Sequence, residues 1–321
     1  MASAPIIRAG LQIPDFNRVA SEPGDLMGRL AAVATTAEDA GFDSIYVMDH
    51  LHQIRGVGPQ ENWMLEGNTA LGALAAVTEK AQLGLMVGGI HYRNPALMAK
   101  ATTTIDVLSG GRAILGIGAA WNDVESLAYG YEFPPLGVRF EMLEDGLRIC
   151  RAMFTSGPGT ATVDGERHHV KDAYNNPQPL RGNIPILIGG SGEKKTLRMV
   201  AQYADASNVF GDVERIKHLM SVIDGHCETV GRDPGEITRT KLATLIVGAT
   251  HEEAAAAAEP LRGPMGERFE QVVLFGDPDG IAEQCAAHRE AGLDGIIVNM
   301  PQVGDLEKVE LAGKTLSAAM A

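Results

Sequence analysis

The chain has 321 residues, of which 45% are hydrophobic and 21% charged, and its formal net charge is −14. This acidic balance argues against nucleic-acid binding, which needs many Lys and Arg side chains to replace counterions on the phosphates. We find no charge-free run long enough for a membrane span and no secretory signal at the start of the chain. Cys150, Cys227 and Cys285 lie far apart, which predicts neither a disulfide framework nor a zinc cluster. We therefore expect a cytoplasmic protein with reduced cysteines.

Short apolar segments alternate along the chain with helical patterns. The predicted strands are Ile6 to Ile13, Ser44 to Met48, Gln82 to Val87, Ala113 to Gly118, Pro185 to Gly189, Ala206 to Phe210, Lys241 to Val247 and Gly295 to Asn299. Their continuous apolar character is typical of parallel strands that are covered by helices. The alternation predicts one domain over residues 1–321, an α/β fold of the (β/α)8 TIM-barrel type. An open, doubly wound sheet is the competing fold.

The helical patterns carry their own local signals. Gly41 and Gly292 each follow a helical segment and precede Asp43 and Asp294 at the start of a strand. Glycine at this place allows the left-handed conformation that closes the last helical turn. Three apolar stripes at helical spacing predict buried helix faces. They are Leu26, Leu30, Val33 and Ala37; Phe140, Leu143, Leu147, Cys150 and Phe154; and Ile216, Leu219, Ile223 and Cys227.

Three segments are longer than the connections of a minimal barrel. Gln53 to Met64 follows the second strand, Thr155 to Ile184 precedes the fifth, and Leu261 to Phe275 follows the seventh. These are the insertions that we assign after strands 2, 4 and 7. Within the middle one, Asp164-Gly165 predicts the turn of a β-hairpin. Because barrel active sites form at the carboxyl ends of the strands, we expect such loops to cover a pocket.

His50, preceded by Asp49, follows directly on the second predicted strand. An imidazole with a pKa of about 6.5 at a strand end of a barrel suits proton transfer. A histidine that only caps the strand by hydrogen bonding is the structural alternative. The pair His50 and His52 also resembles a metal-binding pattern. We find no further histidine or well-placed acidic ligand at the other strand ends, so we expect no metal site.

Glycine-rich segments end three other strands. Gly189 to Gly192 precede a helix with Lys194 and Lys195 in its first turn, and free backbone N–H groups at a helix start favour an anion. A tight turn with solvated lysines is the alternative. Gly88-Gly89 and Gly118 to Ala120 end the third and fourth strands. Small residues at neighbouring strand ends predict a planar, phosphate-bearing ligand across the barrel mouth. Trp63 and Trp121 are expected to be packing residues.

Several of these segments are similar to motifs of one enzyme family. They are Tyr46-Val-Met-Asp49-His50, Leu83-Gly-Leu-Met-Val, Tyr92-Arg93-Asn94-Pro95-Ala96, Thr104 to Arg112, Leu115-Gly-Ile-Gly-Ala-Ala-Trp-Asn122 and Ile188 to Arg198. Across nearly its whole length the sequence resembles the luciferase-like monooxygenase superfamily. It most resembles the branch that uses the deazaflavin coenzyme F420.

The resemblance implies roles for individual residues. His50 is implied as the acid/base or electrostatic partner of the deazaflavin, with Asp49 beside it. The third strand is implied to carry a non-prolyl cis peptide at Leu85–Met86 and to support one face of the ring with Leu85, Met86 and Val87. The other implied cofactor residues are Gly118, Ala119, Ala120 and Asn122 for the ring and ribityl chain, Gly189, Gly190, Ser191 and Gly192 for the phosphate, and Lys194, Lys195 and Arg198 for the acidic tail.

The implied activity is hydride transfer between F420 and a small carbonyl compound, alcohol or activated alkene. An FMN-dependent two-component monooxygenase and a non-catalytic flavin-binding barrel are the alternatives. The basic residues with which family members hold a sugar phosphate cannot be matched here, which argues against that substrate. Because the chain and the coenzyme are both acidic, we expect a locally positive rim formed by Lys194, Lys195 and Arg198, to which Arg55 or Arg93 could add. A small-molecule substrate and a homodimer are expected, without nucleic-acid or membrane partners.

Overall fold

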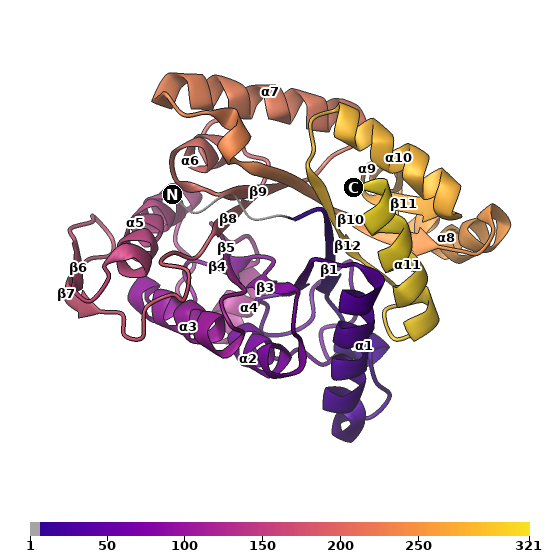
Figure 1. Cartoon of the computed structure of the whole chain (residues 1–321), viewed down its shortest axis with the longest axis horizontal. Helices are drawn as coiled ribbons and strands as arrows, with labels where there is room; N and C mark the ends of the chain where they lie inside the picture. Colours follow the sequence, from indigo (N-terminus) through magenta and orange to yellow (C-terminus); the bar gives the residue numbers. More distant parts are fainter. Residues whose placement is uncertain (1–6) are drawn as a thin grey trace.

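Eight parallel strands close into a barrel in the computed structural model, which describes residues 7–321 (Figure 1). The barrel order is β1, β2, β3, β5, β8, β9, β10 and β12, and β12 pairs with β1 to close it. Its strands are β1 (Ala9–Ile13), β2 (Ser44–Val47), β3 (Gln82–Leu85), β5 (Ala113–Gly118), β8 (Ile186–Gly189), β9 (Ala206–Val209), β10 (Thr238–Val247) and β12 (Gly295–Asn299). The TIM-barrel prediction is confirmed. Ile6 and the chain start lie outside the described residues.

Helices surround this barrel, as Figure 1 shows. They are α1 (Leu26–Ala40), α2 (Gly67–Val77), α3 (Pro95–Leu108), α4 (Asp123–Ala128), α5 (Leu136–Thr155), α6 (Thr196–Tyr203), α7 (Val213–Val230), α8 (His251–Met265), α9 (Arg268–Val272), α10 (Pro278–Glu290) and α11 (Leu306–Ala319). The predicted stripes of α1 and α7 are fully buried, and that of α5 is buried except for the half-buried Phe140. None of the helices described is long and apolar enough to cross a membrane.

The third barrel position is built from two pieces rather than one strand. β3 ends at Leu85, and β4 (Gly88–Gly89) then resumes the pairing with β5. The peptide bond between Met86 and Val87 is cis, so the implied position Leu85–Met86 is wrong by one residue. Leu85 still pairs with Val47 in the sheet, and the chain leaves the strand only after it.

The insertions take more regular structure than the sequence suggested. β6 (Thr160–Val163) and β7 (Val170–Tyr174) form the predicted hairpin, which packs on α5 because the Asp145 carboxylate accepts the N–H groups of Arg167 and His168. The segment Leu261 to Phe275 is not a long loop. It contains the end of α8, the whole of α9 and most of β11 (Val273–Gly276), which pairs with β10. Pro260 and Pro264 lie inside α8, and such prolines normally predict a helix end.

The Gly-Asp junctions organise the edge of the barrel opposite to the strands' carboxyl ends. Gly41 closes α1 with a φ of 103°, and the Asp43 carboxylate accepts the N–H groups of Arg8 and Ala9 at distances of 2.7 and 3.2 Å. Asp294 accepts the N–H of Arg239 in the same way. Each carboxylate therefore satisfies backbone donors at the start of a neighbouring strand.

We expect Asp43→Ala to lower the free energy of unfolding by about 1–3 kcal/mol, because the partly buried N–H of Ala9 then loses its acceptor, while the exposed N–H of Arg8 can bind water instead. Asp39→Ala is the control, since this carboxylate is 78% exposed and within residues 7–321 its one ion pair is with Lys80, which is 70% exposed. It should change the free energy by less than about 1 kcal/mol. Urea denaturation of both variants measures the difference, and equal midpoints would contradict the assignment.

Candidate active site

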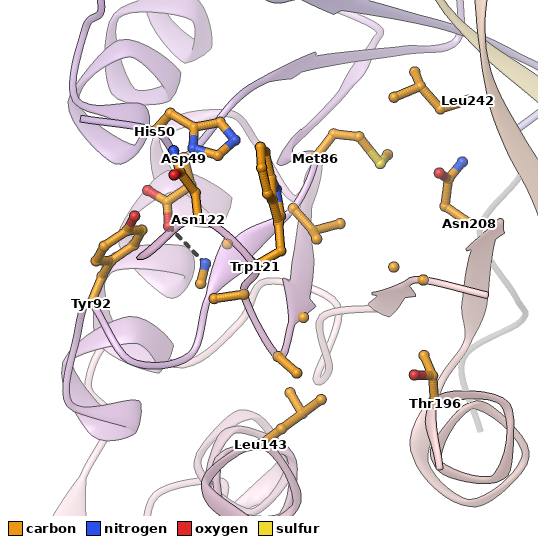
Figure 2. Close-up of a pocket in the computed structure, with 18 of the residues that line it drawn as sticks. Asp49, His50, Met86, Tyr92, Trp121, Asn122, Leu143, Thr196, Asn208 and Leu242 are labelled. Carbon is orange, nitrogen blue, oxygen red and sulfur yellow. Dashed lines mark hydrogen bonds between the residues drawn. The ribbon is translucent and has the colours of Figure 1, made fainter. Parts of the chain in front are cut away.

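A cavity of about 310 Å³ opens at the carboxyl ends of the barrel strands (Figure 2). The predicted site residues that line it are Asp49, His50, Met86, Val87, Gly118, Ala119, Ala120, Asn122, Gly189 and Gly190. Those outside the lining are Leu85, Ser191, Gly192, Lys194, Lys195 and Arg198. The described lining contains no residue of the loop 53–64 or of the hairpin. The wall instead continues from β5 through α4 into the start of α5, so the expected cover by the insertions is wrong.

The His50 side chain is held by the carboxylate of Glu125, a residue that no sequence pattern predicted for the site. Its Nδ1 lies 2.5 Å from Oε1 of Glu125 on α4, and the other oxygen of Glu125 accepts the N–H of Leu51 at 2.8 Å. The Glu125 side chain is fully buried, and burial by itself would raise its pKa. The hydrogen bonds from His50 and Leu51 outweigh this effect, so the pKa of Glu125 lies below its ordinary value. The carboxylate therefore accepts from Nδ1–H.

The second imidazole nitrogen, Nε2, has no hydrogen-bond partner within residues 7–321 and belongs to a side chain that lines the cavity. Figure 2 shows the His50 ring beside the indole of Trp121, and their centroids are 5.8 Å apart in an edge-on arrangement. Trp121 lines the cavity and is 62% exposed, so the expectation that it is a packing residue is wrong. Trp63 does pack against the main core.

Asp49 forms a buried ion pair instead of facing the cavity with a free oxygen. Arg93 donates to both of its oxygens, at 2.6 and 2.7 Å, and the N–H of Gly89 donates to one of them at 3.1 Å. Burial raises the pKa of Asp49, while Arg93 and Gly89 oppose the rise. Arg93 also contacts Glu66 at 2.5 Å, so its guanidinium is committed to two carboxylates and is not a free cation of the rim. Asp49 thus ties the end of β2 to β4.

The glycines at two of the strand ends leave space that a neighbouring side chain fills. A Cβ at Gly118 would lie 3.0 Å from a methyl group of Val87, and one at Gly189 would lie 2.9 Å from it. The side chain that follows the cis bond therefore fills the space at two of the positions that we expected to be bare. Ala119, Ala120 and Gly190 remain as small residues that line the cavity.

Arg139 of α5 supports the adjacent loop from outside the cavity. One Nη donates to the carbonyls of Ala119 and Ala120, at 3.2 and 2.8 Å, and the guanidinium carbon lies 3.9 Å from the centroid of the Phe133 ring. Ala120 has a φ of 59°, which L residues rarely adopt. Burial lowers the pKa of this arginine. The loop after β5 is thus fixed by a cation that neither reaches the lining nor pairs with a carboxylate in the described chain.

The segment after β8 presents a row of unpaired backbone donors. The N–H groups of residues 191–195 have no acceptor in the part of the chain that the structure describes, whereas the N–H of Gly190 is bound to the carbonyl of Asn208. Gly190 has a φ of 126°, which turns the chain away from the strand. Thr196, the first residue of α6, lines the cavity. Such a turn before a helix is suited to an anion.

The cations near this segment differ in their availability. Lys194 is exposed and has no ion-pair partner within residues 7–321, and Lys195 lies over the Phe140 ring at 5.4 Å. Arg198 instead lies 4.0 Å from Glu144.

In the described chain, no group of three or more His, Cys, Asp or Glu side chains is placed to hold a metal ion, and His52 contacts the carbonyl of Gln53.

Comparison with known proteins shows the family to which the chain belongs. A model described as luciferase-like monooxygenase matches residues 7–272. An uncharacterised protein of Mycobacterium tuberculosis is 30% identical over 81% of this chain and 91% of its own. An F420-dependent glucose-6-phosphate dehydrogenase of Kineococcus radiotolerans is 32% identical over 78% of this chain and 73% of its own.

Among solved structures, an F420-dependent secondary alcohol dehydrogenase in complex with an F420-acetone adduct has a TM-score of 0.82 at 19% identity, covering 98% of this chain and 99% of that one. This likeness supports the barrel fold. The match of the family model over most of the chain agrees with it, and the chain belongs to the luciferase-like monooxygenase family.

Proposed function

We propose that this chain is an F420-dependent oxidoreductase that transfers a hydride between the deazaflavin and a small alcohol, carbonyl compound or activated alkene. The observation that carries the proposal is the His50–Glu125 pair, which directs an imidazole nitrogen without a protein partner to the cavity. Relatives named F420-dependent dehydrogenases that match most of this chain support the choice of cofactor. FMN, the alternative cofactor, is an outcome of the binding test below.

The cavity suits a cofactor of this kind at two places. The unpaired N–H groups of residues 191–195 and the start of α6 would hold a phosphate, with Lys194 and Lys195 close to a negatively charged tail. Met86, Val87 and the small residues Ala119 and Ala120 would contact the ring system. Leu85 and Arg198 take no part in this proposal, because the former packs in the core and the latter lies near Glu144.

The bound coenzyme supplies the hydride donor or acceptor, and the protein supplies the proton and the position. His50 gives a proton to the substrate oxygen, or takes one from it, through Nε2. Glu125 fixes the orientation of the ring by accepting from Nδ1–H and stabilises the positive charge of a protonated imidazole. Asp49 is a positioning residue, because its oxygens are occupied by Arg93 and Gly89. The indole of Trp121 shields the imidazole from water on one side.

We expect His50→Ala to reduce kcat by roughly 100- to 10,000-fold, the usual contribution of a general acid or base, with a small change in the Kd for F420. Glu125→Gln should reduce kcat as well but by less, because the amide still accepts one hydrogen bond and lacks the charge. His52→Ala is the matched control, since this neighbouring histidine does not line the cavity. Steady-state kinetics and fluorescence titration measure both quantities. Equal turnover of the His50 and His52 variants would contradict the role of His50.

We expect F420 to bind more tightly than FMN, with an affinity that falls as salt rises, because its negatively charged tail is attracted by Lys194 and Lys195 and salt screens this attraction. Lys194→Gln should raise the Kd for F420 about five-fold at low salt and flatten its salt dependence, consistent with about 1 kcal/mol for one partly screened charge pair. Lys171→Gln, an exposed lysine on β7, is the control. Tight binding of FMN without a response to F420 would favour the monooxygenase alternative.

A further inference from the structure

The cavity around His50 contains no lysine or arginine side chain, although the chain has 27 such residues. Its ionisable lining consists of Asp49, His50, Tyr92 and Glu125. Two guanidinium groups that bond lining residues are committed to them from outside: Arg93 to Asp49 and Glu66, and Arg139 to two backbone carbonyls and the Phe133 ring. An anion placed beside His50 would therefore lose hydration without gaining a cation, next to a buried carboxylate.

Two lysines directly precede Thr196, a lining residue that lies across the cavity from His50. Lys194 and Lys195 belong to the segment of unpaired N–H groups before α6, which the proposed function assigns to the cofactor phosphate. In Figure 2, Thr196 at the start of α6 and His50 lie on opposite sides of the cavity. A phosphate at the His50 end would be separated from these lysines by the width of the site.

The mouth of the cavity is apolar instead. Trp121, Leu136 and Phe210 line it and are 62%, 52% and 47% exposed. They come from three separate segments: after β5, at the start of α5 and after β9. We call these three side chains the apolar rim. Large exposed apolar side chains that converge on one cavity indicate contact with an apolar partner, and the indole contacts His50 edge-on.

We infer that the substrate is an uncharged alcohol or ketone with an apolar body that packs on the apolar rim, and not a phosphorylated sugar. This inference rests on the proposed function and names the substrate class of the same site. In the oxidative direction the alcohol carbon loses a hydride to oxidised F420 and the hydroxyl proton goes to His50, which leaves a ketone. The reverse reaction consumes the hydride and the proton. The apolar body lies against Trp121, which places the reacting carbon beside the imidazole.

The test compares two alcohols of the same shape that differ in charge: 1-phenylethanol with a para-methyl group and its para-carboxylate analogue, with glucose 6-phosphate as a third compound. On the F420-loaded protein we expect kcat/KM for the neutral alcohol to exceed that for either anion by about 100-fold or more. Calorimetric titration with the two matching ketones should give the same order of affinity without turnover.

Variants of the rim separate this inference from a general loss of function. Leu136→Ala should raise KM for the neutral alcohol about five- to ten-fold with a smaller change in kcat, because apolar contact area is lost. Leu136→Lys should improve the anionic alcohol and impair the neutral one. Tyr174→Ala is the control, since this aromatic residue is 65% exposed on β7, outside the cavity. It should leave both alcohols unchanged.

The outcomes distinguish the two proposals. If F420 binds and an anionic compound is used as well as the neutral alcohol, or if Leu136→Lys does not change their ratio, the inferred substrate class is wrong while the cofactor assignment stands. If F420 does not bind, the proposed function fails. In that case preferential calorimetric binding of the neutral ketone, weakened by Leu136→Ala, would still support an apolar ligand, and its absence would overturn the inference.

Discussion

The hydrogen bond between Glu125 and His50 joins two strand ends that lie far apart in the chain. His50 follows β2, whereas Glu125 lies on the short helix α4 after β5. The carboxylate also accepts the N–H of Leu51, so one buried group fixes the imidazole and the backbone beside it. Without this interaction the ring could turn either nitrogen to the cavity. With it, Nδ1 is bound to Glu125 and Nε2 is the nitrogen that can exchange a proton with a ligand. The functional interpretation depends on this constraint.

A second buried carboxylate gives the same region its rigidity. Asp49 binds Arg93 in a bidentate manner and accepts the N–H of Gly89, while Arg93 also contacts Glu66 at the start of α2. The end of β2, the short strand β4 and α2 are thus connected through one guanidinium. His50 is the next residue along the chain. Its position is therefore set from two directions, by Asp49 through the backbone and by Glu125 through the ring.

The barrel and much of its site could be predicted from the sequence because their signals are local. Apolar runs, Gly-Asp junctions and strand-end glycines are each contained within a few residues. Glu125, by contrast, is an acidic residue on an exposed-looking helix, and only the closure of the barrel brings it to His50. The strand-end glycines could be interpreted in two ways. Gly118 and Gly189 line the cavity, but the space beside them is also filled by the Val87 side chain. The sequence alone does not reveal which neighbour fills the space that a Cβ would take.

The distribution of charge explains how an acidic chain can contain a site for an acidic cofactor. Arg93 and Arg198 were expected in a positive rim, yet Arg93 pairs with two carboxylates and Arg198 lies near Glu144. Arg139 is likewise bound to two carbonyls and an aromatic ring. Unpaired N–H groups and Lys194 occur together in the segment before α6. Arg55, the other arginine that we expected in the rim, is exposed but does not line the cavity. One end of the cavity is thus suited to a phosphate and the other to a neutral molecule. Because an anion is stabilised at only one of these ends, the charge pattern itself orients the cofactor and leaves the region beside His50 and Trp121 for an apolar substrate.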